Sequence, residues 1–285
     1  PLRAAPAAGE ADVSGFDLTS LAISGRVDFR GTVLLAEDEP RTQSQYRLQL
    51  RDNDFESTAA GGFGLAGLRG VLVQRGQVMV SRRVSAILGA TPVVLEDARF
   101  VRRDNGFRLE TKVSARGLPL DAEHLRFFLD PETVRALVDE LGFRGEVDVD
   151  GASLQVSGRA GGDGQVRFEG LVRPKDAFVD IGLPLAIRSA EVRLRTLVYE
   201  GGHVRAWADV TKLSGRLAER RLEDARMLVT YVEPHLSILD LDGRLEGGVL
   251  RDLGGRGGPA FSIDLQGSFP FDLGLRIEGA DIAGI

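Results

Sequence analysis

The residues from Gly62 to Gly67 match the glycine spacing of a dinucleotide-binding loop. That loop binds a pyrophosphate only where a strand precedes it and a helix follows it, because the helix N-terminus supplies the N–H groups. The residues that follow here, Gly70–Val73 and Val78–Val80, are of strand type. We therefore predict a glycine-rich turn with no nucleotide at this position.

A second candidate is a run of acidic residues at alternate positions, Glu146, Asp148 and Asp150. Calcium loops use this spacing, but they end on a bidentate Glu at the position that Ser157 holds here. The intervening residues are valines, which favour a strand. We therefore predict a solvated strand face instead of a calcium site.

The three histidines, His124, His203 and His235, are scattered and match no metal or nucleophile motif. A Ser/His/Asp triad assembled from distant residues is the one catalytic alternative that spacing leaves open. With no local signature of catalysis, we predict that the chain is not an enzyme and uses no metal or other cofactor.

The amino-acid composition limits the classes of partner that the chain is expected to bind. The 285 residues carry a net charge of −6, and the 36 basic residues, all but three of them arginine, form no block. Nucleic-acid binding would require a basic patch and is not expected. The absence of cysteine excludes disulfides and fits an envelope compartment.

Alternation with period two is the dominant pattern, and it predicts antiparallel strands with one wet face. Apolar residues alternate with charged ones in Tyr46–Arg51, Phe107–Ala115, Val147–Asp150, Val166–Glu169, Glu191–Arg195, Val204–Thr211 and Phe271–Glu278. Turn signals separate the runs, which predicts a meander with short connections. These signals are Asp104–Gly106, Gly161–Gly164, Glu200–Gly202, Asp242–Gly243 and Gly254–Gly258.

One segment breaks this pattern, and we predict a helical insert at 120–141. Asp121 can cap a first helix through Leu129, and Asp130–Pro131 can begin a second that ends at Gly142. Val134, Leu137, Val138 and Leu141 follow helical spacing.

Two short matches indicate an internal repeat. Gly25–Gly31 resembles Gly145–Gly151, and Leu95–Arg99 is identical to Leu222–Arg226. Their offsets are similar, 145 − 25 = 120 and 222 − 95 = 127, which indicates a duplicated multi-strand unit. We predict a first β unit at 1–119, the insert at 120–141, and a second β unit at 142–285 that is continuous with the first.

The apolar strand faces allow two interpretations. They form the core of a sandwich or closed barrel, or part of them stays uncovered by protein and binds lipid chains. The many runs imply sixteen or more strands, and open sheets of that size usually curl. A curled sheet with few helices leaves an apolar trough.

Several motifs resemble AsmA-like and TamB-like proteins over residues 60–285. They are Gly117–Leu125 with Leu129–Glu132 and Gly145–Val149, the hairpins Tyr199–Val204 and Leu245–Leu250, and Pro259–Leu265. The resemblance implies a repeating β-groove in the periplasm of a diderm bacterium, with an inner-membrane anchor outside this piece. It also implies that phospholipid acyl chains pass along the groove between the inner and outer membranes, with outer-membrane components as further partners.

We therefore expect a mostly β fold, a long curled antiparallel sheet that conducts lipid. The alternative is a structural or assembly module for the outer membrane with a closed β core. Under the first hypothesis the lining is Phe107, Leu109, Val113, Val166, Phe168, Val192, Leu194, Val204, Ala206, Phe271, Leu273, Leu275 and Ile277. An arginine at Leu194 should then block lipid binding, whereas in a closed core it should unfold the chain.

Overall fold

The computed structural model describes residues 22–34, 43–57, 63–103, 106–125, 134–159, 164–180, 183–200, 203–253, 259–264 and 271–279. Within these ranges the chain forms one antiparallel sheet, in which fourteen strands follow a single path from β1 to β13 and on to β16, while β14 and β15 extend from β12. The strands are β1 (Ala22–Leu34), β2 (Gln43–Ser57), β3 (Phe63–Arg75), β4 (Val78–Leu88), β5 (Thr91–Arg103), β6 (Gly106–Pro119), β7 (Arg144–Arg159), β8 (Gln165–Asp180), β9 (Pro184–Glu200), β10 (His203–Leu217), β11 (Arg220–Val232), β12 (His235–Leu245), β13 (Gly248–Asp252), β14 (Phe261–Asp264), β15 (Phe271–Leu273) and β16 (Leu275–Glu278).

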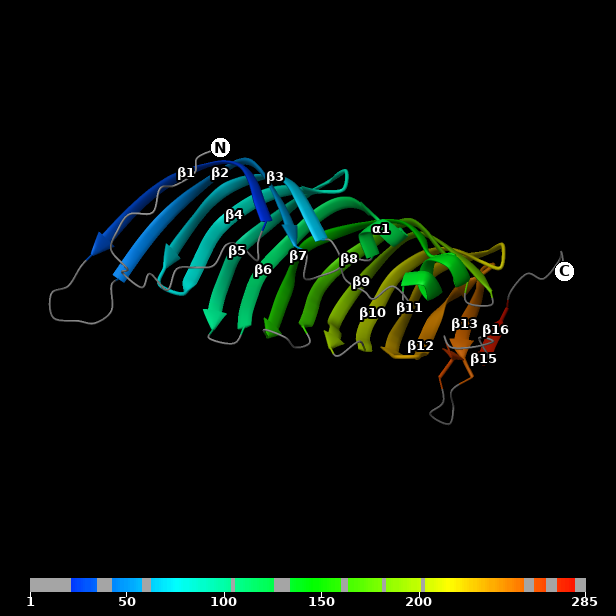
Figure 1. Ribbon diagram of the computed structural model, residues 1–285. Coiled ribbons are helices and arrows are strands. Elements are labelled where there is room, and N and C mark those ends of the chain that lie inside the picture. Colours follow the sequence, from blue (N-terminus) through cyan, green and yellow to red (C-terminus); the bar gives the residue numbers. More distant parts are fainter. Residues whose placement is uncertain are drawn as a thin grey trace.

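The strands are arched and lie side by side along the length of the molecule (Figure 1). In the described part, β1 and β16 stand at opposite ends of the strand order and do not pair, so the sheet is not closed. The prediction of a mostly β chain built on one antiparallel sheet is confirmed. The alternative of a barrel closed by strand pairing is wrong for this sheet.

Short connections join most of the neighbouring strands, and two of the predicted turn signals fall between paired strands. Asp104–Gly106 joins β5 to β6, and Glu200–Gly202 joins β9 to β10. Asp242–Gly243 is an exception, because it lies inside β12 and Gly243 pairs with Leu250.

The turn after β12 falls instead at Glu246 and Gly247, which both have positive φ, 48° and 77°, as a two-residue hairpin requires. Gly243 serves a different purpose, because a Cβ there would lie 2.8 Å from the Cα of Ala225. The predicted loop Gly254–Gly258 lies outside the described residues.

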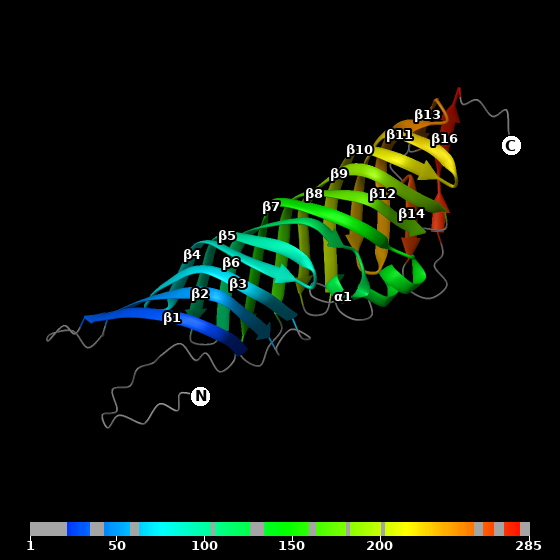
Figure 2. The same ribbon diagram turned by 90° about the horizontal axis from the view of Figure 1, so that it is seen from above.

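The segment between β6 and β7 contains short helical turns at one side of the row of strands (Figure 2). Helix α1 (Ala122–Leu125) begins at Asp121, whose Oδ1 accepts a hydrogen bond from the His124 N–H at 2.9 Å, so the predicted cap is confirmed. Residues Ala136–Glu140 are wound as a π-helix, η3, instead of the α-helix that the spacing predicted. Gly142 follows with φ of 59°, the left-handed conformation expected after a helix end. The expected boundaries at Leu129 and Asp130–Pro131 lie outside the described residues.

Both sequence matches correspond to an offset of six strands. Gly25–Gly31 lies in β1 and Gly145–Gly151 in β7, while Leu95–Arg99 lies in β5 and Leu222–Arg226 in β11. The central Asp of the second match, Asp97 or Asp224, has positive φ in both copies, 51° and 49°. The division into two units stays a prediction, since β6 pairs directly with β7 across the proposed boundary.

These positive-φ positions are β-bulges, which bend a strand and increase its twist. Asp tolerates the left-handed conformation at a modest cost, whereas a β-branched residue does not. We expect Asp224→Val to lower the free energy of unfolding by about 2 kcal/mol. Asp224→Gly should leave it within about 1 kcal/mol of wild type. Urea titration followed by circular dichroism measures both, with Thr230→Val in the extended part of β11 as the control; equal losses in both Asp224 variants would contradict the strained backbone.

Candidate functional site

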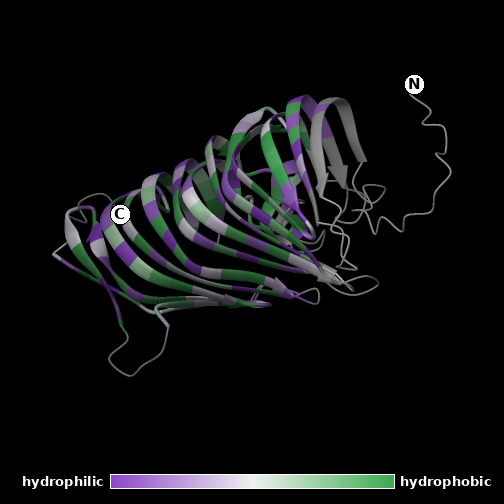
Figure 3. Cartoon of the chain, turned by 90° about the vertical axis from the view of Figure 1, so that its left-hand side faces the viewer, coloured by the Kyte–Doolittle hydropathy of each residue, from purple (hydrophilic) through white to green (hydrophobic). Residues whose placement is uncertain are grey.

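The strand register assigns every side chain to one of two faces. A row of paired residues crosses the sheet from β6 to β14, each pairing with the next: Thr111, Leu154, Phe168, Leu197, Ala206, Tyr231, Leu236 and Ile263. Paired residues in an antiparallel sheet point to the same side. We call this side the apolar face and the opposite side the charged face. Figure 3 shows the resulting alternation of hydrophobic and hydrophilic residues along the strands.

The register places eleven of the predicted lining residues on the apolar face: Phe107, Leu109, Val113, Val166, Phe168, Val192, Leu194, Val204, Ala206, Leu275 and Ile277. Their exposure differs widely, from 3% for Val204 to 39% for Phe107 and 45% for Ile277. Phe271 and Leu273 pair with Ile263 and Phe261, but their side chains lie outside the described part.

The last run, predicted as one strand over 271–278, divides at Gly274 into β15 and β16. The two short strands have different partners, β14 and β13. A role of any of these residues in lining a groove stays a prediction.

The apolar face is more deeply buried towards one rim of the sheet. The rim with the hairpins at 89–90, 218–219 and 246–247 also holds the helical turns, and we call it the insert rim. There Leu88, Leu213 and Leu222 are only 3%, 1% and 3% exposed. No second sheet covers them in the described residues, so their burial comes from the curvature of the sheet. Leu213 and Leu222 are also in one buried cluster with Leu141, the residue that follows η3.

The opposite rim, where β3 ends and β4 begins, β5 ends and β6 begins, and β9 ends and β10 begins, is the open rim. Apolar residues of β6 to β9 near this rim, among them Phe107, Leu109, Val156 and Leu197, are partly exposed. An apolar strip therefore remains accessible beside the open rim. Sequence alternation predicted the face but not this difference between its two halves, which follows from curvature.

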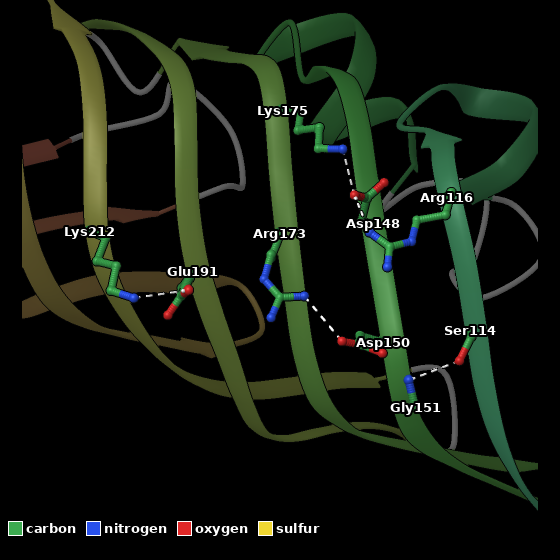
Figure 4. A network of polar contacts seen from close by, with 9 residues as sticks. All are labelled: Ser114, Arg116, Asp148, Asp150, Gly151, Arg173, Lys175, Glu191 and Lys212. Carbon is green, nitrogen blue, oxygen red and sulfur yellow. Dashed lines mark hydrogen bonds and ion pairs between the residues drawn. The ribbon is translucent and has the colours of Figure 1, made fainter.

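The charged face carries ion pairs between neighbouring strands (Figure 4). Arg195 donates two hydrogen bonds of 2.6 Å to Asp209, and these hydrogen bonds hold the pKa of that carboxyl below its usual range. Lys212 lies 3.1 Å from Glu191. Exposed pairs of this kind contribute about 0–1 kcal/mol each to stability. Their main effect is therefore to keep the charged face hydrated.

Asp148 is different, because its side chain is only 3% exposed. It is 2.5 Å from Lys175 Nζ, and it accepts hydrogen bonds from Arg116 at 3.2 Å and from the Gly117 N–H at 2.9 Å. The hydrogen bond from Lys175, followed by that from Gly117, lowers the pKa of Asp148. The strand predicted for the acidic run is confirmed, since Glu146, Asp148 and Asp150 lie in β7. The prediction of a solvated face is wrong at Asp148, because the strand register buries that side chain against Lys175. The described residues contain no cluster of three or more potential metal ligands.

We expect Asp148→Asn to lower the free energy of unfolding by about 1–3 kcal/mol at pH 7, because it removes a buried charge that satisfies two cations. Since the folded pKa is depressed, this contribution is complete above the unfolded value of about 3.9. It is lost as the pH falls through the folded pKa, so the two proteins should converge in acid. Urea midpoints measured in steps from pH 7 down through pH 3 test this, with the exposed Asp150→Asn as the control; a difference that does not shrink as the pH falls below about 3.9 would show that the effect is not the charge.

The histidines do not assemble a common site. His124 is buried and pairs with Asp121 at 2.7 Å, while His203 and His235 are exposed and lie 3.7 Å and 3.6 Å from Glu233 and Asp264. The turn predicted at Gly62–Gly67 is wrong from Phe63 onward, because β3 already begins at Phe63. The strand predicted to follow at Gly70–Val73 is confirmed. The described residues include no helix with the length and apolar character needed to cross a membrane.

Comparison of the chain with protein-family models, with curated proteins and with solved structures finds no match. The class is therefore defined by architecture: an open, arched, single-layer antiparallel sheet with one apolar and one charged face.

Proposed function

We propose that the chain binds phospholipid acyl chains along the open half of its apolar face and conducts lipid between the inner and outer membranes. It would do so as a periplasmic segment of an AsmA-like protein in a diderm envelope. The observation that carries the proposal is the row of paired residues that crosses eight strands of the apolar face, together with the partly exposed apolar residues beside the open rim. The resemblance of the sequence motifs to repeating-β-groove proteins supports the same function.

The energetics of such a face suit transport. Each methylene that leaves water contributes about 0.8 kcal/mol, so a long acyl chain binds without directional contacts. A lining of Val, Leu, Phe and Tyr offers similar binding energy at successive strands. Shallow, repeated sites of this kind let a lipid move along the sheet without a deep trap.

A structural module of the outer membrane is the second candidate. The observation that favours it is the deep burial at the insert rim, where Leu213 and Leu250 are each 1% exposed. Under this function the helical turns and the curvature complete a core, and the open rim serves as a contact surface for protein.

Native mass spectrometry of the purified chain, followed by lipid extraction in organic solvent, separates the two functions. Phospholipid that co-purifies at a reproducible stoichiometry is the expected result. A mass without lipid, unchanged after incubation with labelled phospholipid, would overturn lipid conduction and favour the structural module.

A further inference from the structure

Arg102 is a charged residue in an apolar setting. It pairs with Phe107 in the register of β5 and β6, so its side chain starts on the apolar face, where it is the last residue of β5 on that face before the open rim. Its backbone N–H donates to the Gln77 carbonyl at 2.9 Å, which fixes this end of β5. In the described part of β3 to β10, the register places no other charged side chain on the half of the apolar face next to the open rim.

The surface beside Arg102 is aromatic. Phe100 and Phe107 stack with ring centroids 5.7 Å apart and an interplanar angle of 14°. The Phe107 ring lies over Gly158 of β7, where a Cβ would come within 2.8 Å of the ring. Phe107 is nevertheless 39% exposed, so the stacked pair offers accessible apolar surface at the strand position that pairs with Arg102.

Other polar-tipped side chains of the apolar face also occur near this rim. The register places Gln74, Tyr199 and Tyr231 there. Tyrosine commonly occupies boundaries where one end of the ring is apolar and the other meets water. The open rim is therefore the place where a bound lipid would change from acyl chain to headgroup.

Arginine suits one part of a phospholipid in particular. Its planar guanidinium donates paired hydrogen bonds to phosphate, and its aliphatic stem packs on apolar surface. Resting on the proposed function, we infer that Arg102 binds the phosphate of a phospholipid whose acyl chains lie on Phe100, Phe107 and Leu109. Phosphate recognition at the rim then makes the chain selective for phospholipids over neutral lipids with the same acyl chains.

The test compares dioleoylphosphatidylglycerol with dioleoylglycerol, both in detergent micelles, as competitors for a fluorescent fatty-acyl probe. Wild type should bind the phospholipid about tenfold more tightly, since a charge-assisted hydrogen bond contributes that much. Arg102→Ala should weaken only phosphatidylglycerol and bring the two affinities within about threefold. Arg108→Ala, which removes an exposed arginine from the charged face of β6, should leave the ratio unchanged.

The outcomes separate this assignment from the proposed function. If the phospholipid preference is absent in wild type or survives in Arg102→Ala, the phosphate site is wrong while acyl-chain binding stands. If neither lipid displaces the probe, the proposed function fails with it. If glycerophosphoglycerol, which has no acyl chains, competes as well as the lipid, Arg102 belongs to a site for free phosphate esters, and the lipid assignment is overturned.

Discussion

An arginine in place of Leu194 is expected to abolish acyl-chain binding while the sheet stays folded. Leu194 pairs with Gly170 on one side and Ala208 on the other, so its neighbours leave room for a longer side chain. It belongs to neither of the two buried clusters of the apolar face. The aliphatic stem of an arginine can lie along the sheet while its guanidinium reaches water.

The same arginine places a cation in the path of a hydrocarbon chain. Covering it would strip the guanidinium of water without a compensating hydrogen bond, which costs several kcal/mol, so binding of a fluorescent phospholipid should fall by at least about tenfold. Circular dichroism and the urea midpoint report on the fold. Arg193→Ala, one residue away on the charged face, is the matched control and should bind normally. Unfolding of Leu194→Arg would favour the structural module, and normal binding by a folded variant would remove Leu194 and its partners Gly170 and Ala208 from the lipid path.

A single methyl group added at Gly215, as in Gly215→Ala, is expected to cause a large loss of stability. A Cβ at Gly215 would lie 2.0 Å from the carbonyl oxygen of Ala186 and 3.1 Å from the Cα of Ile187. Both are backbone atoms of β9, so no side-chain rotation relieves the overlap. The strands β9 and β10 would have to separate, next to Leu213 in the buried cluster.

The expected cost is about 3 kcal/mol or more, at the upper end of what overpacking causes. Gly164→Ala provides the control, because its nearest neighbour, the Ser157 carbonyl oxygen, lies 3.5 Å from the added methyl. Equilibrium unfolding in urea gives both values. An unchanged midpoint in Gly215→Ala would contradict the close approach of the two strands.

The faces of the strands could be predicted wherever alternation runs without a bulge. Residues Phe107 to Ala115 of β6 follow period two throughout, and their assignment to two faces is confirmed by the register. In β9 the alternation that includes Leu194 changes phase before Leu197. The cause is a bulge in β9 between Leu194 and Thr196, whose partners in β10, Ala208 and Trp207, are adjacent residues. Period two alone therefore cannot show that Leu197 and Tyr199 share a face with Leu194.

Contacts between side chains of different strands could not be predicted from local sequence patterns. Asp148 is one of three acidic residues with identical spacing, and only the register brings Arg116, 32 positions earlier, against it. The same holds for Gly215, whose need for glycine comes from a neighbouring backbone and from no turn. Lipid binding could be proposed only from resemblance, because the alternation of apolar and polar residues in the sequence is the same whether protein or lipid covers the apolar face.

The strand order has a consequence for communication within the molecule. From β2 to β12 each described strand pairs with the strand before it and the strand after it along the chain, with β14 as an added partner of β12. Such an array couples nearest neighbours, and a local disturbance fades over a few units instead of reaching the whole domain. Occupancy near β3 would then leave affinity near β11 unaltered. Under the proposed function, several lipid molecules would follow one another in single file, each advancing without cooperativity and without a global change of conformation.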